Sequence, residues 1–543
     1  MPVKRLSNII LLLLGCSITI ISCNNEGGGS ALTNIFKSEV IDIDALDQKI
    51  ASDSISNIKN ILEVDSTFSF AVFSNLYAQK KSKWFDKFGL TDNGKQLLQQ
   101  IKLAKSEGLD PGDYNYSYLD SVLKDIENLE GKDLQTAEYK LSHAFLKFSK
   151  DLVFGKVLPL EIDKNWQNVN DTSWSMDSMI LSMNEKPMNE ILDELRPTHP
   201  WYKKFRQTSI RLQDLNQYKI DRSELPEQVL EGDSSVKIQA LRSILSKVVD
   251  TNLDARKMVW DTEAVNALFD YQKKYGLAVT GQFDSATIVS LTEESNETVK
   301  QLGLNMERIR WLQKDFLDEF IWVNIPQMEV NFYEQDSLTF NMRAVVGRLS
   351  RKTPTLDSKL SNIVFNPPWY VPPTILKQEV LPGILRRGGS YLARRGLVAR
   401  DRRGRKINPS RINASNYRRY SISQNPGRNS ALGSVKFNFP NKEAIFLHDT
   451  NHRGDFGRKY RAFSSGCIRV HHPKDFASFI LRDTTYNEEG INKVIKQRQT
   501  KSVKVKRDIG VHIVYLTNAV DSTGKVVKVK DVYKWDSKLA ARL

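Results

Sequence analysis

The pattern of apolar residues changes at about Phe320, and this change constrains the fold more than any other feature of the chain. From about Asp65 to Leu230 the apolar residues recur at helical spacing. After Phe320, short runs rich in β-branched and aromatic residues are broken by Gln, Gly and Pro. With 543 residues, the chain is long enough to form several domains. We therefore predict a multidomain α+β protein with a helical first part and a β-rich last part.

Residues 260–294 predict a compact pair of helices. Thr262 is placed to cap the first helix, a turn follows at residues 280–281, and the second helix is expected over residues 284–291. The spacing of the apolar residues, Gln272 and the glycines resembles the small helical peptidoglycan-binding domain of many wall enzymes. A generic helical hairpin fits the same pattern.

The strand signals lie in the last part of the chain. Four prolines in residues 366–373 fix φ and keep the residues before them out of helices, so this stretch is expected to be extended. Residues 521–524 predict a hairpin turn. The expected strands are 321–325, 328–333, 341–346, 435–439, 444–447 and 511–517.

Residues 1–22 have the composition of an export signal. Lys4 and Arg5 give it a charged start, and residues 9–15 form a short apolar run. This run is too short and too poorly flanked to predict a membrane-spanning helix. We therefore expect residues 1–22 to be a leader that is not part of the fold.

The leader ends in Ile20-Ile21-Ser22-Cys23, which resembles the lipobox of bacterial lipoproteins. The resemblance implies that Cys23 is lipidated and becomes the mature N-terminus, with residues 24–30 as a flexible tether. Cys16 is a second possible site, and an ordinary secretory signal is the alternative. The expected location is the periplasm of a Gram-negative bacterium, with the protein anchored to a membrane through its N-terminal lipid.

The chain is strongly basic, with a net charge of +15 and a pI near 9.3. Nucleic acid, anionic lipid and acidic wall polymers would all be attracted to it. Export makes nucleic acid the least favoured of these, and we expect no nucleic-acid partner. Much of the excess charge lies in residues 386–406, which predict a solvated loop or lid face, with polyanion binding there as the alternative.

Cys467 is the only cysteine outside the N-terminal segment, so it has no intramolecular partner. Arg469 lies two residues away and places a positive charge where it favours a thiolate. The alternative is that Cys467 is a small buried hydrophobic residue.

His448 follows an apolar run and precedes Cys467 by 19 positions. An imidazole is the usual base beside a nucleophilic thiol, and a loop can bring the two together. The backbone N–H groups of Gly466 and Cys467 are candidates for an oxyanion site, because glycine permits the turn that points them inward.

Three further histidines, His452, His471 and His472, lie close by in the sequence and raise the alternative of a metal site. The candidate zinc ligands would be His448, His452, Cys467 and His471. Their spacing in the sequence matches none of the usual short ligand pairs, so we expect no metal and no cofactor. The remaining histidines, His143, His199 and His512, are expected to serve packing.

The segment His448-Asp449-Thr450, together with residues 464–470, resembles the signature of the L,D-transpeptidases, cysteine enzymes of bacterial wall synthesis. Residues 366–382, the arginine-rich insertion and residues 431–437 are similar to the large periplasmic members, which carry a helical scaffold, a peptidoglycan-binding domain and a lid. The resemblance implies Cys467 as nucleophile and His448 as base, the imidazole being oriented by a backbone carbonyl. Ser465, Arg469 and Asp449 are then near the site, but Ser465 and Asp449 depart from the residues of many relatives, which leaves their roles open.

The family implies attack on the carbonyl before the terminal D-alanine of a tetrapeptide stem, and a 3→3 crosslink as product. Alternatives are a carboxypeptidase with water as acceptor, attachment of an outer-membrane protein to the wall, and a non-catalytic wall-anchoring lipoprotein. The expected divisions are 1–22 signal, 23–60 lipidated tether and linker, 61–240 scaffold, 245–298 peptidoglycan-binding domain, 318–520 catalytic domain with lid 376–429, and 521–543 hairpin and tail.

Overall fold

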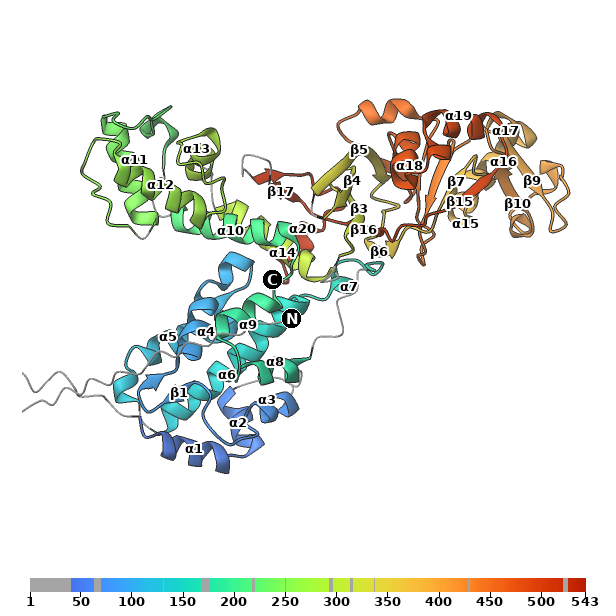
Figure 1. Ribbon diagram of the computed structural model, residues 1–543. Helices are drawn as coiled ribbons and strands as arrows, with labels where there is room; N and C mark the ends of the chain where they lie inside the picture. The colour runs from blue at the N-terminus through green and yellow to red at the C-terminus, as the bar shows by residue number, and fades with distance from the viewer. Residues whose placement is uncertain are drawn as a thin grey trace, which may run out of the picture.

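The computed structural model confirms a mixed α+β architecture with a helical first part and a β-rich last part (Figure 1). It describes residues 41–62, 70–129, 131–167, 175–216, 220–249, 251–292, 296–312, 316–335, 337–427, 430–520 and 526–543. The expected signal, Cys16 and the lipidation site Cys23 lie outside these ranges, as does the expected turn at 521–524. No helix of the described residues is long and apolar enough to cross a membrane.

The scaffold is a helical region with its own core, built around the long helix α6. Its buried residues run from Leu46 to Leu195. Thr91 caps α4 by accepting a hydrogen bond from the Gly94 N–H at 3.2 Å. The elements are α1 (Ile43–Ser52), α2 (Ile55–Leu62), α3 (Phe70–Leu76), β1 (Phe85–Asp86), β2 (Gly89–Leu90), α4 (Asp92–Lys102), η1 (Ala104–Glu107), η2 (Pro111–Tyr114), α5 (Tyr116–Leu123), η3 (Ile126–Asn128), α6 (Gly131–Phe154), α7 (Pro159–Ile162), α8 (Met176–Ser182) and α9 (Met188–Leu195).

The expectation of a linker up to residue 60 is wrong for its last part. Helices α1 and α2 bury Leu46, Ile50 and Leu62 in the scaffold core. Asp42 caps α1 by accepting from the Ala45 N–H at 3.0 Å. This cap and the apolar spacing were readable from the sequence, because Asp before an amphipathic run is a helix-start signal.

The small helical unit contains three helices where the sequence predicted two. Helix α11 (Val236–Val248) shares one core with α12 (Thr262–Lys274) and α13 (Ser285–Thr292), so this core begins before residue 245. Asp261, not Thr262, caps α12. Gln272 binds the predicted turn, since its Oε1 accepts from the N–H groups of Thr280 and Gly281, both at 2.9 Å.

Two helices, α10 (Pro200–Asn216) and α14 (Asn296–Arg310), connect the scaffold to the sheet (Figure 1). They share a core with strand residues that include Phe320 and Trp322. The short η4 (Arg222–Glu224) lies between α10 and α11.

Turn η1 packs against α10 and α14, and we call this contact the scaffold junction. Gly108 has a φ of +74°, and a Cβ built there would lie 2.3 Å from the Gly303 Cα. The two backbones therefore touch, and only glycine fits at this position.

Buried charge also holds the scaffold junction together. Glu107 is fully buried and accepts hydrogen bonds from Arg196 at 2.7 Å, from Arg206 at 3.1 Å and from the Tyr202 hydroxyl at 2.6 Å. Arg310, equally buried, donates to the Glu107 carbonyl at 2.7 Å. Burial alone would raise the pKa of Glu107, but the surrounding arginines outweigh it and hold the pKa far below its usual range.

The β-rich last part is built on a mixed sheet with the order β15-β7-β11-β12-β14-β5-β4-β3-β16-β6, and β13 pairs with β5. Most of the pairs are antiparallel, but β12 runs parallel to β14, β3 parallel to β16 and β13 parallel to β5. The strands are β3 (Glu319–Asn324), β4 (Glu329–Glu334), β5 (Ser337–Gly347), β6 (Leu356–Lys359), β7 (Asn362–Phe365), β11 (Val435–Asn438), β12 (Leu447–His448), β13 (Ala462–Ser464), β14 (Ile468–Val470), β15 (Lys501–Lys504) and β16 (Gly510–Val514).

The expected strand 444–447 is shorter and lies later than predicted. Ala444 has a φ of +53°, and the Asn441 side chain accepts from the Ile445 N–H at 2.8 Å and donates to its carbonyl at 2.7 Å. These side-chain bonds compete with a sheet ladder for the backbone of Ile445. Only Leu447 and His448 form β12.

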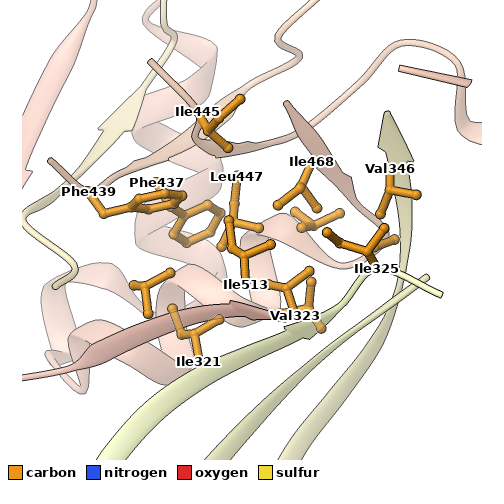
Figure 2. Close-up of a cluster of buried hydrophobic side chains, with 14 of the residues drawn as sticks. Ile321, Val323, Ile325, Val346, Phe437, Phe439, Ile445, Leu447, Ile468 and Ile513 are labelled. Carbon is orange, nitrogen blue, oxygen red and sulfur yellow. The ribbon is translucent and has the colours of Figure 1, made fainter. Parts of the chain in front are cut away.

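One face of this sheet carries the apolar core shown in Figure 2, where residues such as Phe437, Leu447 and Ile468 come together. The C-terminal residues are not a separate tail, because Tyr533, Trp535 and Leu539 are buried in this core. The remaining elements are η8 (Arg453–Gly457), α18 (Pro473–Leu481), η9 (Thr484–Tyr486), α19 (Glu488–Lys496), the hairpin β17 (Asn518–Val520) and β18 (Val526–Lys528), and α20 (Asp536–Ala540).

The segment between β7 and β11 folds into a lid with its own apolar cluster and a three-stranded sheet of order β8-β10-β9. The cluster contains Val371, so the folded lid begins before residue 376. Its elements are β8 (Trp369–Tyr370), α15 (Pro373–Ile375), the π-helix η5 (Leu376–Val380), α16 (Leu381–Arg387), α17 (Gly389–Arg394), β9 (Leu397–Arg400), η6 (Pro409–Arg411), η7 (Tyr417–Arg419) and β10 (Ser421–Gln424).

Candidate active site

Three ionisable side chains form a row across neighbouring strands. The sheet register places His448 of β12 opposite Lys436 of β11 on one side and opposite Arg469 of β14 on the other. Residues directly opposite one another project from the same face of a sheet. Cys467 comes two residues before Arg469, next to β14, so alternation puts its thiol on that face too, whereas Ile468 points into the core.

The Cys467 thiol is half-buried and forms no disulfide. Its Sγ donates a hydrogen bond to the Ala444 carbonyl at 3.8 Å, and the described residues show no hydrogen bond between this thiol and the His448 ring. Burial raises the pKa of Cys467 to about 11, although the Phe446 N–H and the charges of Lys436 and Arg469 act in the opposite direction. Arg469 therefore favours the thiolate, as the sequence predicts, but burial has the larger effect.

The His448 imidazole is buried and fixed by the backbone. Its Nδ1 donates to the Asp449 carbonyl at 2.5 Å, which leaves Nε2 as the nitrogen that can accept a proton. Burial, assisted by the positive charge of Arg469, lowers the pKa of His448 to about 3. The ring is therefore neutral at neutral pH.

Asp449 fixes the loop that holds the imidazole, and its carboxylate accepts no hydrogen bond from the ring. Its Oδ2 accepts from the N–H and the hydroxyl of Ser434, both at 2.8 Å, and its Oδ1 accepts from the Thr450 N–H at 2.7 Å and from Arg453 at 2.9 Å. A Cβ on Gly433 would lie 2.3 Å from the Asp449 Cγ. The carboxylate thus ties the start of β11 to the end of β12.

Gly466 shapes the turn before the thiol. Its φ of +118° favours glycine, while a Cβ built there would make only ordinary contacts at 3.5 Å. Its N–H, a candidate oxyanion donor from the sequence, already donates to the Ser464 hydroxyl at 3.1 Å. Its carbonyl accepts from the Thr353 hydroxyl at 2.7 Å, and Thr353 is held in turn by the Tyr533 hydroxyl, which accepts from the Thr353 N–H at 2.9 Å.

Ser465 lies between the thiol loop and the lid. Its hydroxyl accepts from Arg351 at 2.9 Å and from Arg348 at 3.3 Å. Both arginines also form ion pairs with Glu379 in η5 of the lid, at 2.7 and 2.9 Å. We call this contact the lid junction.

The other histidines contribute little to the site. His471 packs against the Phe456 ring, and the His472 Nδ1 lies 3.1 Å from a carboxylate oxygen of Asp475. Within the described ranges, no group of three or more His, Cys, Asp or Glu side chains is placed to hold a metal ion. His199 and His512 are buried among aromatic rings, as a packing role requires.

Sequence reasoning missed Lys436, Thr353, Arg348 and Arg351. Lys436 reaches the site only because β11 and β12 pair in a particular register, and its ammonium lies 3.8 Å from the centre of the Phe446 ring. The two arginines lie more than a hundred positions before Ser465. A single sequence carries no signal that brings such distant residues together.

The fold and the site together define a mixed-sheet domain with a free thiol and a backbone-anchored imidazole on neighbouring parallel strands. A family model described as YkuD, the L,D-transpeptidase catalytic domain, matches residues 318–496. A second model, described as a scaffold domain, matches residues 71–208. The chain thus contains a segment that matches the L,D-transpeptidase catalytic domain and joins it to a segment that matches a scaffold domain.

A curated relative from Haemophilus influenzae, named "Putative L,D-transpeptidase", is 36% identical over 254 residues, which cover 46% of this chain and 51% of the relative. The chain therefore matches about half the length of this relative. A solved structure titled as the Ldtfm-avibactam carbamoyl enzyme covers 40% of this chain and 64% of its own, with 9% identity and a TM-score of 0.19. That likeness is too low to carry an argument.

Proposed function

We propose that this protein is an L,D-transpeptidase that acts on peptidoglycan tetrapeptide stems through a thioester on Cys467. The observation that carries the proposal is the in-register row on the sheet face. His448 is anchored through Nδ1 and flanked by two cationic side chains, next to the only cysteine of the described residues. Cysteine chemistry needs such a base, and nearby positive charge favours the thiolate that develops during attack.

The first half of the reaction acylates the thiol. The Cys467 sulfur attacks the carbonyl carbon before the terminal D-alanine, while the thiol proton passes to the His448 Nε2. The C–N bond then breaks, and the leaving amine takes that proton from the imidazolium. A thioester remains on Cys467 and D-alanine is released. Because thiol and imidazole are both neutral at rest, proton transfer accompanies the attack.

The second half transfers the acyl group. An amine on a second stem attacks the thioester carbonyl, His448 takes a proton from the attacking nitrogen, and the C–S bond breaks. The imidazolium returns its proton to the sulfur. The product is a 3→3 crosslink. The lid beside the site supports an amine acceptor, because a covered site excludes the water that would otherwise hydrolyse the thioester.

A carbapenem tests the nucleophile directly, since it forms a stable acyl adduct with such a thiol. Mass spectrometry of the full chain is expected to show one adduct, which is absent from Cys467→Ala and forms at least tenfold more slowly in His448→Gln. Tyr370→Phe, which changes an exposed lid residue, is the matched control. An adduct that persists in Cys467→Ala contradicts the proposal.

The resting protonation states give an independent check. Because burial raises the pKa of Cys467 to about 11, the thiolate fraction grows about tenfold per pH unit below that value. Alkylation of Cys467 by iodoacetamide is therefore expected to accelerate steadily from pH 6 to pH 10. A plateau below pH 8 would show a thiolate already formed in the resting protein.

The location and the acceptor complete the proposal. The lipobox-like segment ending at Cys23 supports a lipoprotein anchored in the periplasm, and the small helical unit with α12 and α13 supports peptidoglycan binding. Muropeptide separation after incubation with wall sacculi distinguishes the acceptors. New 3→3 dimers support crosslinking, shortened stems without dimers indicate water, and wall-bound protein indicates a lysine amine.

A further inference from the structure

The lid junction holds a carboxylate in a site built from two arginines. The Glu379 Oε1 accepts from Arg351 at 2.7 Å and from Arg348 at 2.9 Å, and both guanidinium groups also donate to the Ser465 hydroxyl. Gln378, the preceding lid residue, accepts from the Arg351 Nε at 3.0 Å. Two consecutive side chains of η5 therefore occupy donors that belong to the catalytic domain.

The arginine pair has capacity beyond what Glu379 uses. The Arg348 Nε is shielded from solvent and has no hydrogen-bond partner within the described part of the chain. Two guanidinium groups face a single carboxylate, so one positive charge is left over. Burial alone would raise the pKa of Glu379, but the two arginines lower it, so the group is ionised at neutral pH. The site is thus a carboxylate receptor with a hydrogen-bond donor unused.

This receptor lies beside the reacting sulfur. Ser465 is two residues before Cys467, so their Cα atoms are at most about 7 Å apart. In a stem that ends in an amino acid, the terminal carboxylate carbon is three bonds from the attacked carbonyl carbon, within about 4 Å. A substrate carbonyl placed on the sulfur therefore has its terminal carboxylate within reach of Ser465 and the arginines.

We infer that Arg348 and Arg351 bind the terminal carboxylate of the donor stem, and that the Glu379 carboxylate occupies this site until substrate displaces it. The inference rests on the function proposed above and adds a recognition site to it. Arg–carboxylate hydrogen bonds are charge-assisted and geometrically specific, which suits a group that every donor stem carries. Displacing Glu379 also releases η5, so donor binding and lid opening are coupled.

Equilibrium binding to full-length Cys467→Ala tests the inference without the reaction. The two ligands are a tetrapeptide stem ending in free D-alanine and the same stem ending in D-alanine amide. The free acid is expected to bind on the order of 10- to 100-fold more tightly, the range for losing a hydrogen bond to a charged group. When Arg348→Gln or Arg351→Gln is combined with Cys467→Ala, most of the preference for the free acid over the amide is expected to disappear.

Glu379→Gln supplies a test that a damaged fold cannot imitate, because it predicts a gain. Removing the competing charge is expected to tighten binding of the free acid several-fold. The affinity for the amide is expected to stay the same. Asp401→Asn is the matched control, since it removes one lid carboxylate whose hydrogen bonds go to Arg403 and Arg405. Asp401→Asn is expected to leave the affinity for both ligands unchanged.

The outcomes separate the two proposals. Equal binding of acid and amide, no binding of either, or a preference that survives both arginine variants overturns the arginine site. If Cys467 still forms an acyl-enzyme in those cases, the proposed function stands. A carboxylate preference that depends on the arginines, with no acyl-enzyme on the unmodified protein, supports the receptor and rejects the transpeptidase.

Discussion

The scaffold junction relies on buried charge, whereas the charges at the lid junction are partly exposed. Glu107 and Arg310 are at most 2% exposed, while the side chains of Arg348 and Glu379 are 41% and 37% exposed. Buried ions that lose a partner are strongly destabilising, but exposed pairs contribute little. The same pairing of arginine with glutamate thus makes a permanent joint in one place and a releasable contact in the other.

Glu107→Gln is the strongest test of this contrast. It leaves Arg196 without its buried counter-charge and is expected to lower the free energy of unfolding by about 3–5 kcal/mol. Denaturant unfolding measures the change. Asp193→Asn removes the exposed partner of the same Arg196 and is expected to change stability by less than about 1 kcal/mol. Similar losses in the two variants would contradict the distinction.

Alanine substitutions at two glycines distinguish the cost of backbone strain from the cost of steric overlap. Gly108→Ala places a Cβ against the Gly303 backbone at a φ of +74°, so strain and overlap add to about 2–4 kcal/mol of destabilisation. Gly404, in the lid, has a φ of +78° with nothing within 4 Å of the new Cβ. Gly404→Ala is expected to lose only about 1 kcal/mol, as strain alone. Equal destabilisation in the two variants would mean that the backbones of Gly108 and Gly303 can move apart at little cost.

Acid is expected to weaken the packing between the start of α10 and the sheet. His199, next to α10, stacks on Trp322 with ring centres 4.7 Å apart, and burial lowers its pKa to about 3, assisted by His512. The unfolded chain binds this proton near pH 6.5, so stability is lost as pH falls from 6.5 toward 3, by up to about 1.4 kcal/mol per pH unit. His199→Phe keeps a ring in place and is expected to flatten the pH dependence. An unchanged slope would exclude His199 as its source.

The smallest effect concerns salt. Screening weakens exposed ion pairs far more than buried ones, so 1 M salt is expected to destabilise the lid junction by less than about 1 kcal/mol and to leave the scaffold junction unchanged. Hydrogen exchange in η5 and α16 is expected to accelerate while α14 does not change. Faster hydrogen exchange in both regions would contradict the expectation that salt weakens only the lid junction.

Local patterns predicted much of the fold. Runs of β-branched and aromatic residues indicated β3, β4 and β5, because such signals depend on neighbours in the sequence. Helices α1 and α2 were missed because their polar residues resembled a linker. The strand before His448 was overestimated because the Asn441 side chain, and no sheet partner, binds the backbone of Ile445.

The site was predictable only in part. Cys467 and His448 could be selected by residue type, and the structure brings them to neighbouring strands. Lys436, Thr353 and the arginine pair depend on sheet register and on a loop that follows β5, and neither can be read from spacing along the chain. The pKa of the thiol was also beyond prediction, because burial outweighs the nearby charges that the sequence does reveal.

The antiparallel pairing of β7 with β11 has a consequence for how this protein can change. Phe365 lies opposite Val435 in that pairing, so the whole lid is topologically an enlarged hairpin loop whose two ends already meet. Replacing it with a short turn would alter the loop-closure entropy by only about 2 kcal/mol. The lid is therefore an exchangeable module, which can be grafted, trimmed or redesigned without re-registering the strands that carry the chemistry.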